Sequence, residues 1–329
     1  MNYSVQEYAR DVVFTIHQAC EHANIEAPII ITESGRAMMA HHAVLITEVI
    51  DVAASLDPHI SNPQAVSSHP ILEELYYLHG ILNLETCHEV FHDAQALKEK
   101  ILEIFNLGHL HLAERACAEH AYRLLIAKIY QLSQQLAYIP DDLKQLESEL
   151  HDIYFCNFSV FQSLPDVWAI NQVFPVTPIH RLNEEPTRQA IIADMSCDSD
   201  GKIDHFIGNH QEQNYLKLHT MNHSPYYLGV FLVGAYQEIL GGLHNLFGDA
   251  NAVHIDLKLD GNWEVKHLVE GDTIEEVLGY AQYHVSQLRN QLHVLIEKGI
   301  KEGVLSTQES AQLQKKFKES LESYTYLTV

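Results

Sequence analysis

A single cysteine stands among three aspartates in the stretch IIADMSCDSDG, residues 191–201. Neighbouring negative charge disfavours a thiolate, so Asp194, Asp198 and Asp200 favour the neutral thiol form of Cys197. A neutral thiol is better suited to donating a proton than to attacking a substrate or binding a metal. The stretch therefore indicates a general acid, and the alternative is a strand that ends in an aspartate-rich turn.

The sequence ITESGR places Glu33, Gly35 and Arg36 directly after the apolar run 29–32. A glycine turn can offer backbone N–H groups to a phosphate, and an arginine adds a bidentate positive charge. The carboxylate of Glu33 could pair with a protonated ring nitrogen. The alternative is a surface turn that holds a local ion pair.

A tyrosine follows a second apolar run in FLVGAYQEILGGLHNLFGD, residues 231–249. Tyr236 comes directly after Gly234 and Ala235, where its hydroxyl could reach a ligand. Taken alone, the pattern is more typical of a core aromatic residue beside a flexible turn.

The stretch HEVFH, residues 88–92, matches the H-E-x-x-H pattern of zinc peptidases. On a helix His88 and His92 would share one face, Glu89 would act as the base, and Glu114 could serve as the third ligand. A chain with 23 histidines also produces such a match by chance. The alternative is a solvated polar face of a helix.

The composition restricts the partners of the chain. With 20 Lys and Arg against 44 Asp and Glu, the net charge of −24 repels nucleic acid and anionic membranes and attracts a cationic substrate. Five scattered cysteines without a CxxC pair, and an N-terminus without an apolar signal segment, predict a cytoplasmic protein. No apolar run is long enough to cross a membrane.

The elements that must position these residues follow from periodicity. Residues 1–39 read as a helix, begun by a capping box of Ser4 and Glu7, and then a buried strand at 29–32, which together form one αβ unit. Short β-like runs over 40–65 and 151–268 predict a β-domain, and residues 66–150 predict an inserted helical bundle. Residues 269–329 are expected to form a helical C-terminal region, in which Thr273 with Glu276 and Ser306 with Glu309 have the same capping-box spacing. The fold class is therefore multidomain α+β.

Three long motifs closely resemble the biosynthetic arginine decarboxylases, which use pyridoxal phosphate and belong to the alanine-racemase-like type. They are ITESGRAMMAHHAVL, FPVTPIHRLNEEPTRQAIIADMSCDSDGKIDHFI and GVFLVGAYQEILGGLHNLFGDANAVH. The resemblance extends over essentially the whole chain. It implies conversion of arginine to agmatine and carbon dioxide for polyamine synthesis, with Mg²⁺ as a further family expectation.

The resemblance also implies a role for each site residue. Glu33 would pair with the pyridinium nitrogen of the cofactor, and Gly35, Arg36 and Tyr236 would bind its phosphate. Cys197 would protonate the α-carbon of the substrate, and Asp198 would bind the guanidinium group. In this family both residues would reach the active site of a neighbouring subunit in a homo-oligomer.

The family further requires a lysine that tethers the cofactor and a glycine-rich phosphate loop, and no segment of this chain matches either. A complete eight-stranded barrel takes about 250 residues, so residues 1–39 would form only its last αβ unit. The chain is therefore expected to resemble the C-terminal half of the family and to need an N-terminal barrel half. The alternative is a decarboxylase-like regulatory subunit without catalysis.

Overall fold

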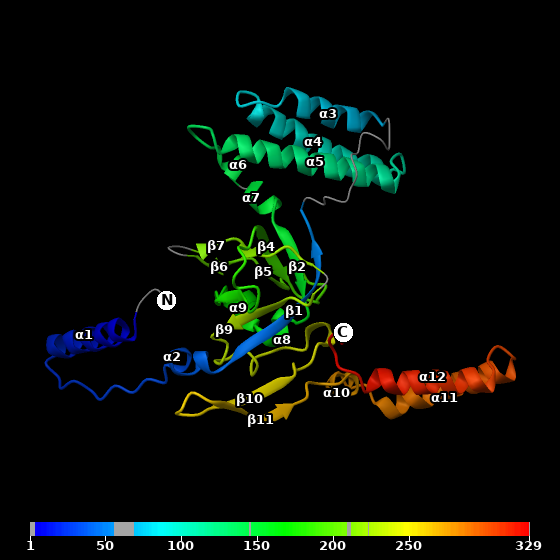
Figure 1. Cartoon of the computed structure of the whole chain (residues 1–329). Coiled ribbons are helices and arrows are strands. Elements are labelled where there is room, and N and C mark those ends of the chain that lie inside the picture. The colour runs from blue at the N-terminus through cyan, green and yellow to red at the C-terminus, as the bar shows by residue number, and fades with distance from the viewer. Residues whose placement is uncertain (1–3, 56–68, 145, 209–211, 223, 329) are drawn as a thin grey trace.

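The computed structural model describes residues 4–55, 69–144, 146–208, 212–222 and 224–328. Figure 1 shows a central sheet with a helical bundle above it, helix α1 standing to one side and a pair of long helices extending to the other. The expected boundary between the first β-segment and the bundle, at residues 65 and 66, lies outside the described residues.

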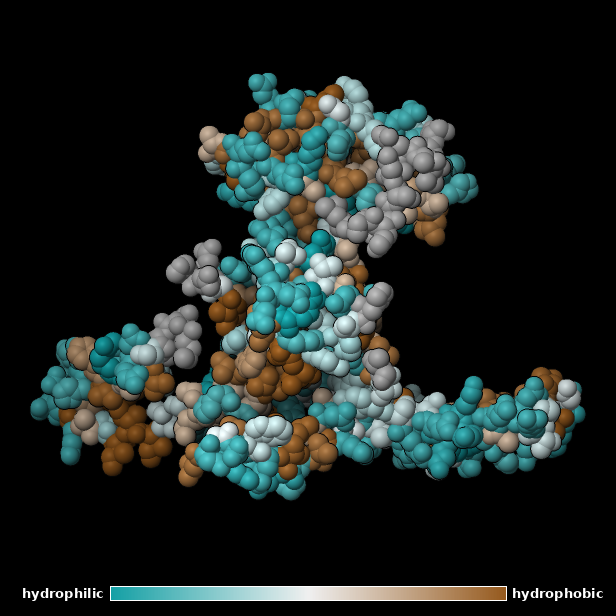
Figure 2. All heavy atoms as spheres, viewed as in Figure 1, coloured by the Kyte–Doolittle hydropathy of each residue, from teal (hydrophilic) through white to brown (hydrophobic). Residues whose placement is uncertain are grey.

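The N-terminal segment begins with helix α1, Val5–Ala23, which has the predicted Ser4 and Glu7 capping box. The predicted strand at 29–32 is wrong for this structure, because residues 25–33 pair with no strand. Ile29 and Ile31 are 92% and 89% exposed, and a strand needs a neighbour to satisfy its backbone groups. Figure 2 shows apolar side chains at the surface of α1 and of the segment that follows it.

The central sheet has seven strands, six of them in the order β3-β9-β1-β2-β4-β5, with β8 also paired to β4. All neighbours are antiparallel except β2 and β4. Strands β3 and β8 lie close to each other, so the sheet curls towards a barrel. The strands are β1 Val44–Ala53, β2 Asp152–Cys156, β3 Val176–Pro178, β4 Arg188–Ala193, β5 Lys202–Ile203, β8 Leu216–Leu218 and β9 Tyr227–Phe231.

Alternation along these strands explains the core of the sheet. In β2 the burial alternates regularly, with Tyr154 and Cys156 pointing inward. The same core contains Leu228 and Val230 of β9 and Phe158 and Leu164 from the segment that follows β2. Helices α8, Val160–Ser163, and α9, Pro165–Ile170, lie in that following segment and carry residues of the site described below.

The inserted bundle has its own hydrophobic core. It consists of α3 Pro70–Ile81, α4 Cys87–Asn106 and α5 Leu112–Ser133, followed by the short helices α6 Asp141–Lys144 and α7 Leu146–Glu149. Helix α4 buries Cys87, Val90, Phe91, Ala94, Leu97 and Ile101, a spacing typical of one helix face. The opposite face of α4 remains in solvent.

The C-terminal part begins with the 3₁₀ turn His244–Leu246 and the two-stranded hairpin of β10 Ala252–Leu257 and β11 Trp263–Val269. It ends with helices α10 Ile274–Tyr280, α11 Val285–Lys301 and α12 Thr307–Leu321. Earlier in the chain, strands β6 Phe206–Ile207 and β7 Glu212–Gln213 form a separate two-stranded pair. The capping boxes of Thr273 with Glu276 and of Ser306 with Glu309 are present. Among the described residues, no helix is both long and apolar enough to cross a membrane.

Candidate active site

Gly35, Arg36 and Tyr236 come together, although about 200 residues separate the tyrosine from the other two. The guanidinium carbon of Arg36 lies 5.1 Å from the centre of the Tyr236 ring. A Cβ atom added to Gly35 would lie only 2.5 Å from the Tyr236 Oη. The hydroxyl therefore sits directly over the glycine, and only a residue without a side chain leaves it in this position.

Residues 33–36 do not form the expected simple turn. Ser34 has a left-handed backbone with φ of 45°, and helix α2, Gly35–Met39, begins immediately after it. Ser34 makes no capping hydrogen bond through its side chain, so its hydroxyl does not occupy the first N–H groups of α2. Glu33 lies just before α2 on the exposed extended segment.

A close backbone approach holds the tyrosine turn against α2 and the 3₁₀ turn Ala40–His42. The Gly234 N–H donates to the Ala40 carbonyl at 2.9 Å, and a Cβ atom at Gly234 would lie 2.2 Å from the Met39 carbonyl oxygen. Tyr236 itself has φ of 72°, which is a strained conformation for a residue with a side chain. The turn is therefore fixed in a conformation that presents Tyr236 to Gly35.

Two residues that the sequence analysis did not identify complete this group. The Arg36 guanidinium donates to the Asp166 carboxylate at 2.7 Å, and Asp166 is buried at the start of α9. The Gln237 side-chain amide also donates to Asp166 at 2.7 Å, and its carbonyl oxygen accepts from the Asp166 backbone N–H at 3.3 Å. Asp166 therefore positions the Arg36 side chain and neutralises part of its charge.

Cys197 lies at the exposed tip of the hairpin between β4 and β5. Its sulfur accepts a hydrogen bond from the Asn245 side chain at 3.4 Å. The neighbouring Asp198 carboxylate lies 3.5 Å from His244 Nε2 and also accepts from the Asp200 N–H at 2.9 Å. His244 and Asn245 belong to the 3₁₀ turn His244–Leu246, and no sequence pattern predicts that this turn lies beside the hairpin.

The three aspartates around Cys197 do not act alike. Asp194 is buried, and it accepts hydrogen bonds from the Val160 N–H and from both the N–H and hydroxyl of Ser196. Burial raises the pKa of Asp194, although these hydrogen bonds oppose the shift. Its role is therefore to anchor the hairpin to α8, whereas Asp198 remains at the exposed tip.

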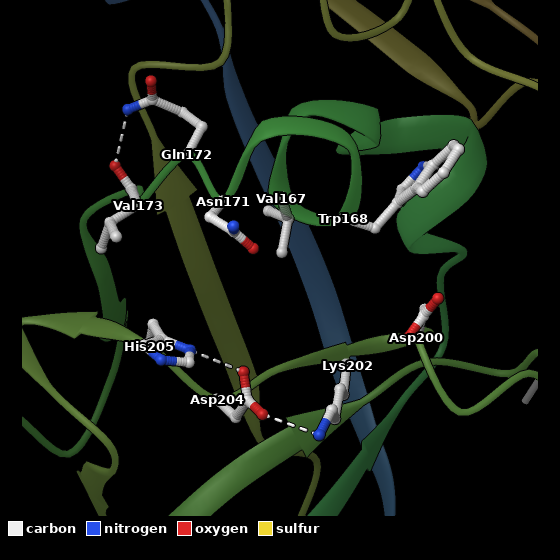
Figure 3. Close-up of a pocket in the computed structure, with 9 residues that line it drawn as sticks. All are labelled: Val167, Trp168, Asn171, Gln172, Val173, Asp200, Lys202, Asp204 and His205. Atoms are coloured by element: carbon white, nitrogen blue, oxygen red, sulfur yellow. Dashed lines mark hydrogen bonds and ion pairs between the residues drawn. The ribbon is translucent and has the colours of Figure 1, made fainter.

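A cavity of about 240 Å³ lies between α9 and the segment around β5, as Figure 3 shows. Its lining includes Trp168, Asp200, Lys202, Asp204 and His205. Asp204 already pairs with Lys202 at 2.7 Å and with His205 at 2.8 Å. None of the residues predicted for the site lines this cavity, so it is not part of the predicted site.

The polar residues of the HEVFH stretch, His88, Glu89 and His92, lie on the exposed face of α4, as the alternative of a solvated helix face predicts. Glu114 is not a third ligand to His88 and His92, because it closes a capping box at the start of α5, where it accepts from the His111 N–H at 2.9 Å. A different carboxylate, Asp142 of α6, lies beside the two histidines. The zinc-peptidase alternative, with Glu114 as third ligand, is therefore wrong.

Two sequence profiles and one crystal structure show which known proteins the chain is similar to. A sequence profile for the arginine decarboxylase helical bundle domain matches residues 65–147, and one for the arginine decarboxylase C-terminal helical extension matches residues 274–327. The crystal structure of the biosynthetic arginine decarboxylase from Campylobacter jejuni superposes with a TM-score of 0.76 at 33% identity, covering 99% of this chain and 52% of that one.

Proteins with similar sequences match the chain over almost its whole length. Biosynthetic arginine decarboxylase 2 from Synechocystis is 44% identical over 99% of this chain, and the enzyme from Thermosynechococcus vestitus is 46% identical over 99%. The chain covers 50% and 51% of these two proteins, so it spans about half the length of the curated relatives it matches. Over almost its whole length the chain is therefore similar to about half of each of these biosynthetic arginine decarboxylases.

Proposed function

We propose that this chain supplies the phosphate-binding residues and the proton donor of a pyridoxal-phosphate-dependent arginine decarboxylase, which converts arginine to agmatine and carbon dioxide. The observation that supports this most strongly is the contact of Gly35 and Arg36 with Tyr236 across about 200 residues of sequence. The resemblance to the family implies that these three residues bind the phosphate of the cofactor.

The residues around Gly35 fit a phosphate group. The first N–H groups of α2, the Tyr236 hydroxyl and the Arg36 guanidinium are all hydrogen-bond donors, and together they suit a dianion. Asp166 accepts a hydrogen bond from one nitrogen of the Arg36 guanidinium and so fixes its orientation. The remaining N–H groups of Arg36 would then hold the phosphate in one orientation. Glu33, just before α2, would pair with the ring nitrogen.

Bound pyridoxal phosphate would supply the electron sink that makes the loss of carbon dioxide feasible. The residues of this chain would then handle the proton. Cys197 would give its thiol proton to the α-carbon of the substrate, and its exposed position lets solvent return that proton afterwards. Asp198, also exposed, would pair with the guanidinium of arginine, and the strong negative charge of the chain favours this cation.

The tethering lysine would come from the half of the family sequence that this chain does not match. Ile29 and Ile31 support such an assembly, because neighbouring strands would cover these exposed side chains. In this proposal residues 1–39 are the last αβ unit of the barrel, 40–65 and 151–268 the β-domain, 66–150 the inserted bundle and 269–329 the helical region. A cytoplasmic homo-oligomer with shared active sites, and a Mg²⁺ requirement, belong to the same proposal.

The test is to co-express the chain with the complementary half of a biosynthetic arginine decarboxylase and to purify the complex. With pyridoxal phosphate present, we expect release of carbon dioxide from arginine and stoichiometric agmatine. A soluble, cofactor-loaded complex without this activity would refute the proposal.

The second candidate function is a non-catalytic subunit that regulates an active relative. The substitution Cys197→Ala separates the two, with Ser199→Ala in the same exposed loop as the matched control. For a proton donor we expect kcat to fall about 100-fold or more in Cys197→Ala while the control stays near the parent value. Equal kcat in all three proteins would support the regulatory function instead.

A further inference from the structure

Three potential metal ligands converge on the outer face of the helical bundle, and none of them belongs to the proposed cofactor site. They are His88 and His92 of α4 and Asp142 of α6, and one ligand atom of each lies within 4.8 Å of the others. In the described part of the chain this is the one group of three such side chains. Figure 1 shows α6 beside the bundle, close to α4 and α5.

The distances suit a single ion at the centre of the group. His88 Nε2 lies 3.2 Å from His92 Nε2 and 2.9 Å from Asp142 Oδ2, and His92 Nε2 lies 3.4 Å from the same oxygen. Ligands at 2.0–2.2 Å from a tetrahedral zinc ion are separated by about 3.3–3.5 Å. The three atoms therefore already lie close to the corners of one face of such a tetrahedron, and only the 2.9 and 3.2 Å separations must lengthen.

The backbone around the three ligands is well supported. Val90 and Phe91, between the two histidines, are buried in the bundle core and fix the rotation of α4. Leu143, next to Asp142, is completely buried and fixes α6 on the bundle. The second carboxylate oxygen of Asp142 accepts from the Leu143 N–H at 3.0 Å, which leaves Oδ2 directed at the histidines.

We propose that His88, His92 and Asp142 bind a divalent transition-metal ion of the zinc type, joining α6 to α4. Two imidazoles and one carboxylate are a ligand set for zinc rather than for magnesium, which prefers oxygen ligands. The site is exposed, so water completes the coordination. The ion has a structural role, because it connects the segment after α5 to the bundle surface, and Glu89 is not one of the ligands.

The experiment uses the 329-residue chain freed of metal by a chelator and titrated with Zn²⁺, followed by calorimetry. Because the chain has 23 histidines, the variants His88→Gln, His92→Gln and Asp142→Asn are compared with the matched control His109→Gln, an exposed histidine of the same bundle. We expect each ligand variant, and not the control, to lose one tight equivalent of Zn²⁺. The loss of affinity should exceed the roughly 10- to 100-fold cost of removing an outer-shell partner.

A second readout reports on the structural role. Zn²⁺ should slow amide hydrogen exchange in α6 of the parent and control proteins and leave it unchanged in Asp142→Asn. Tight Zn²⁺ binding that persists in all three ligand variants would overturn the proposal. Failure of the parent chain to bind any tight equivalent would overturn it as well.

Discussion

Substituting Gly35 by alanine tests whether the Tyr236 hydroxyl is part of the phosphate site. The added methyl carbon would lie 2.5 Å from the Tyr236 Oη, about 0.9 Å short of the 3.4 Å at which ordinary contacts begin. The ring must therefore swing away, because the backbone of α2 is fixed by the segment around Gly234. A hydrogen bond to a charged group contributes about 1.5–3 kcal/mol, so its loss should weaken cofactor binding by about 10- to 100-fold.

A double-mutant cycle makes this prediction specific. Tyr236→Phe removes the hydroxyl that collides with the methyl group, so adding Gly35→Ala to it should cost much less than adding it to the parent chain. The assay is a pyridoxal phosphate titration of the chain assembled with its complementary half. Gly80→Ala is the control, because an added Cβ at that helix position meets nothing within 4 Å. Undiminished cofactor affinity in Gly35→Ala, or fully additive losses, would refute the reasoning.

Three further predictions concern stability and the cofactor link. Asp152→Ala should lower the free energy of unfolding in urea by about 3 kcal/mol, because it leaves the Arg188 guanidinium, bonded at 2.6 and 2.8 Å, without its buried partner; an unchanged midpoint would contradict this. Burial raises the pKa of Asp194 above its usual value, so ionisation of this carboxyl group makes folding less favourable as pH rises. The Tm deficit of Asp194→Asn relative to the parent should therefore shrink as the pH rises above 3.8, and a constant deficit would argue against this. The chain alone should form no borohydride-reducible link to pyridoxal phosphate, and a labelled lysine peptide in mass spectrometry would show that the tethering lysine lies within it.

Local patterns in the sequence were sufficient to predict many elements. Each of the three capping boxes begins the expected helix, since the two residues of a box interact across a single turn. The apolar periodicity of residues 87–106 likewise predicts a helix with one buried face. The strand expected at 29–32 is not formed, because an apolar run becomes a strand only where a neighbouring strand is available for hydrogen bonding, whatever its local propensity.

The partners of the site residues could not be predicted in the same way. Arg36 and Asp166 are 130 residues apart, and Asp166 and Gln237 are 71 apart, so only the fold brings them together. Asp142 joins the two histidines across 54 residues for the same reason. The sequence identified residues with suitable chemistry, whereas the residues that orient them required the structure.

In the proposed function, the segment 24–34 connects assembly with the complementary half to completion of the cofactor site. It carries Glu33 and leads directly into Gly35, yet in the described part of the chain it makes no strand pairing. Burying Ile29 and Ile31 between neighbouring strands would contribute about 1.5–3 kcal/mol for each side chain, and ladder hydrogen bonds would fix the backbone that ends at Glu33. The contacts of Gly35 and Arg36 with Tyr236, which form the phosphate side of the proposed site, are present without that pairing. Assembly with strands of the complementary half would therefore mainly change the position of Glu33. We expect the contact of Glu33 with the ring nitrogen of the cofactor, rather than the contacts with its phosphate, to depend on the complementary half.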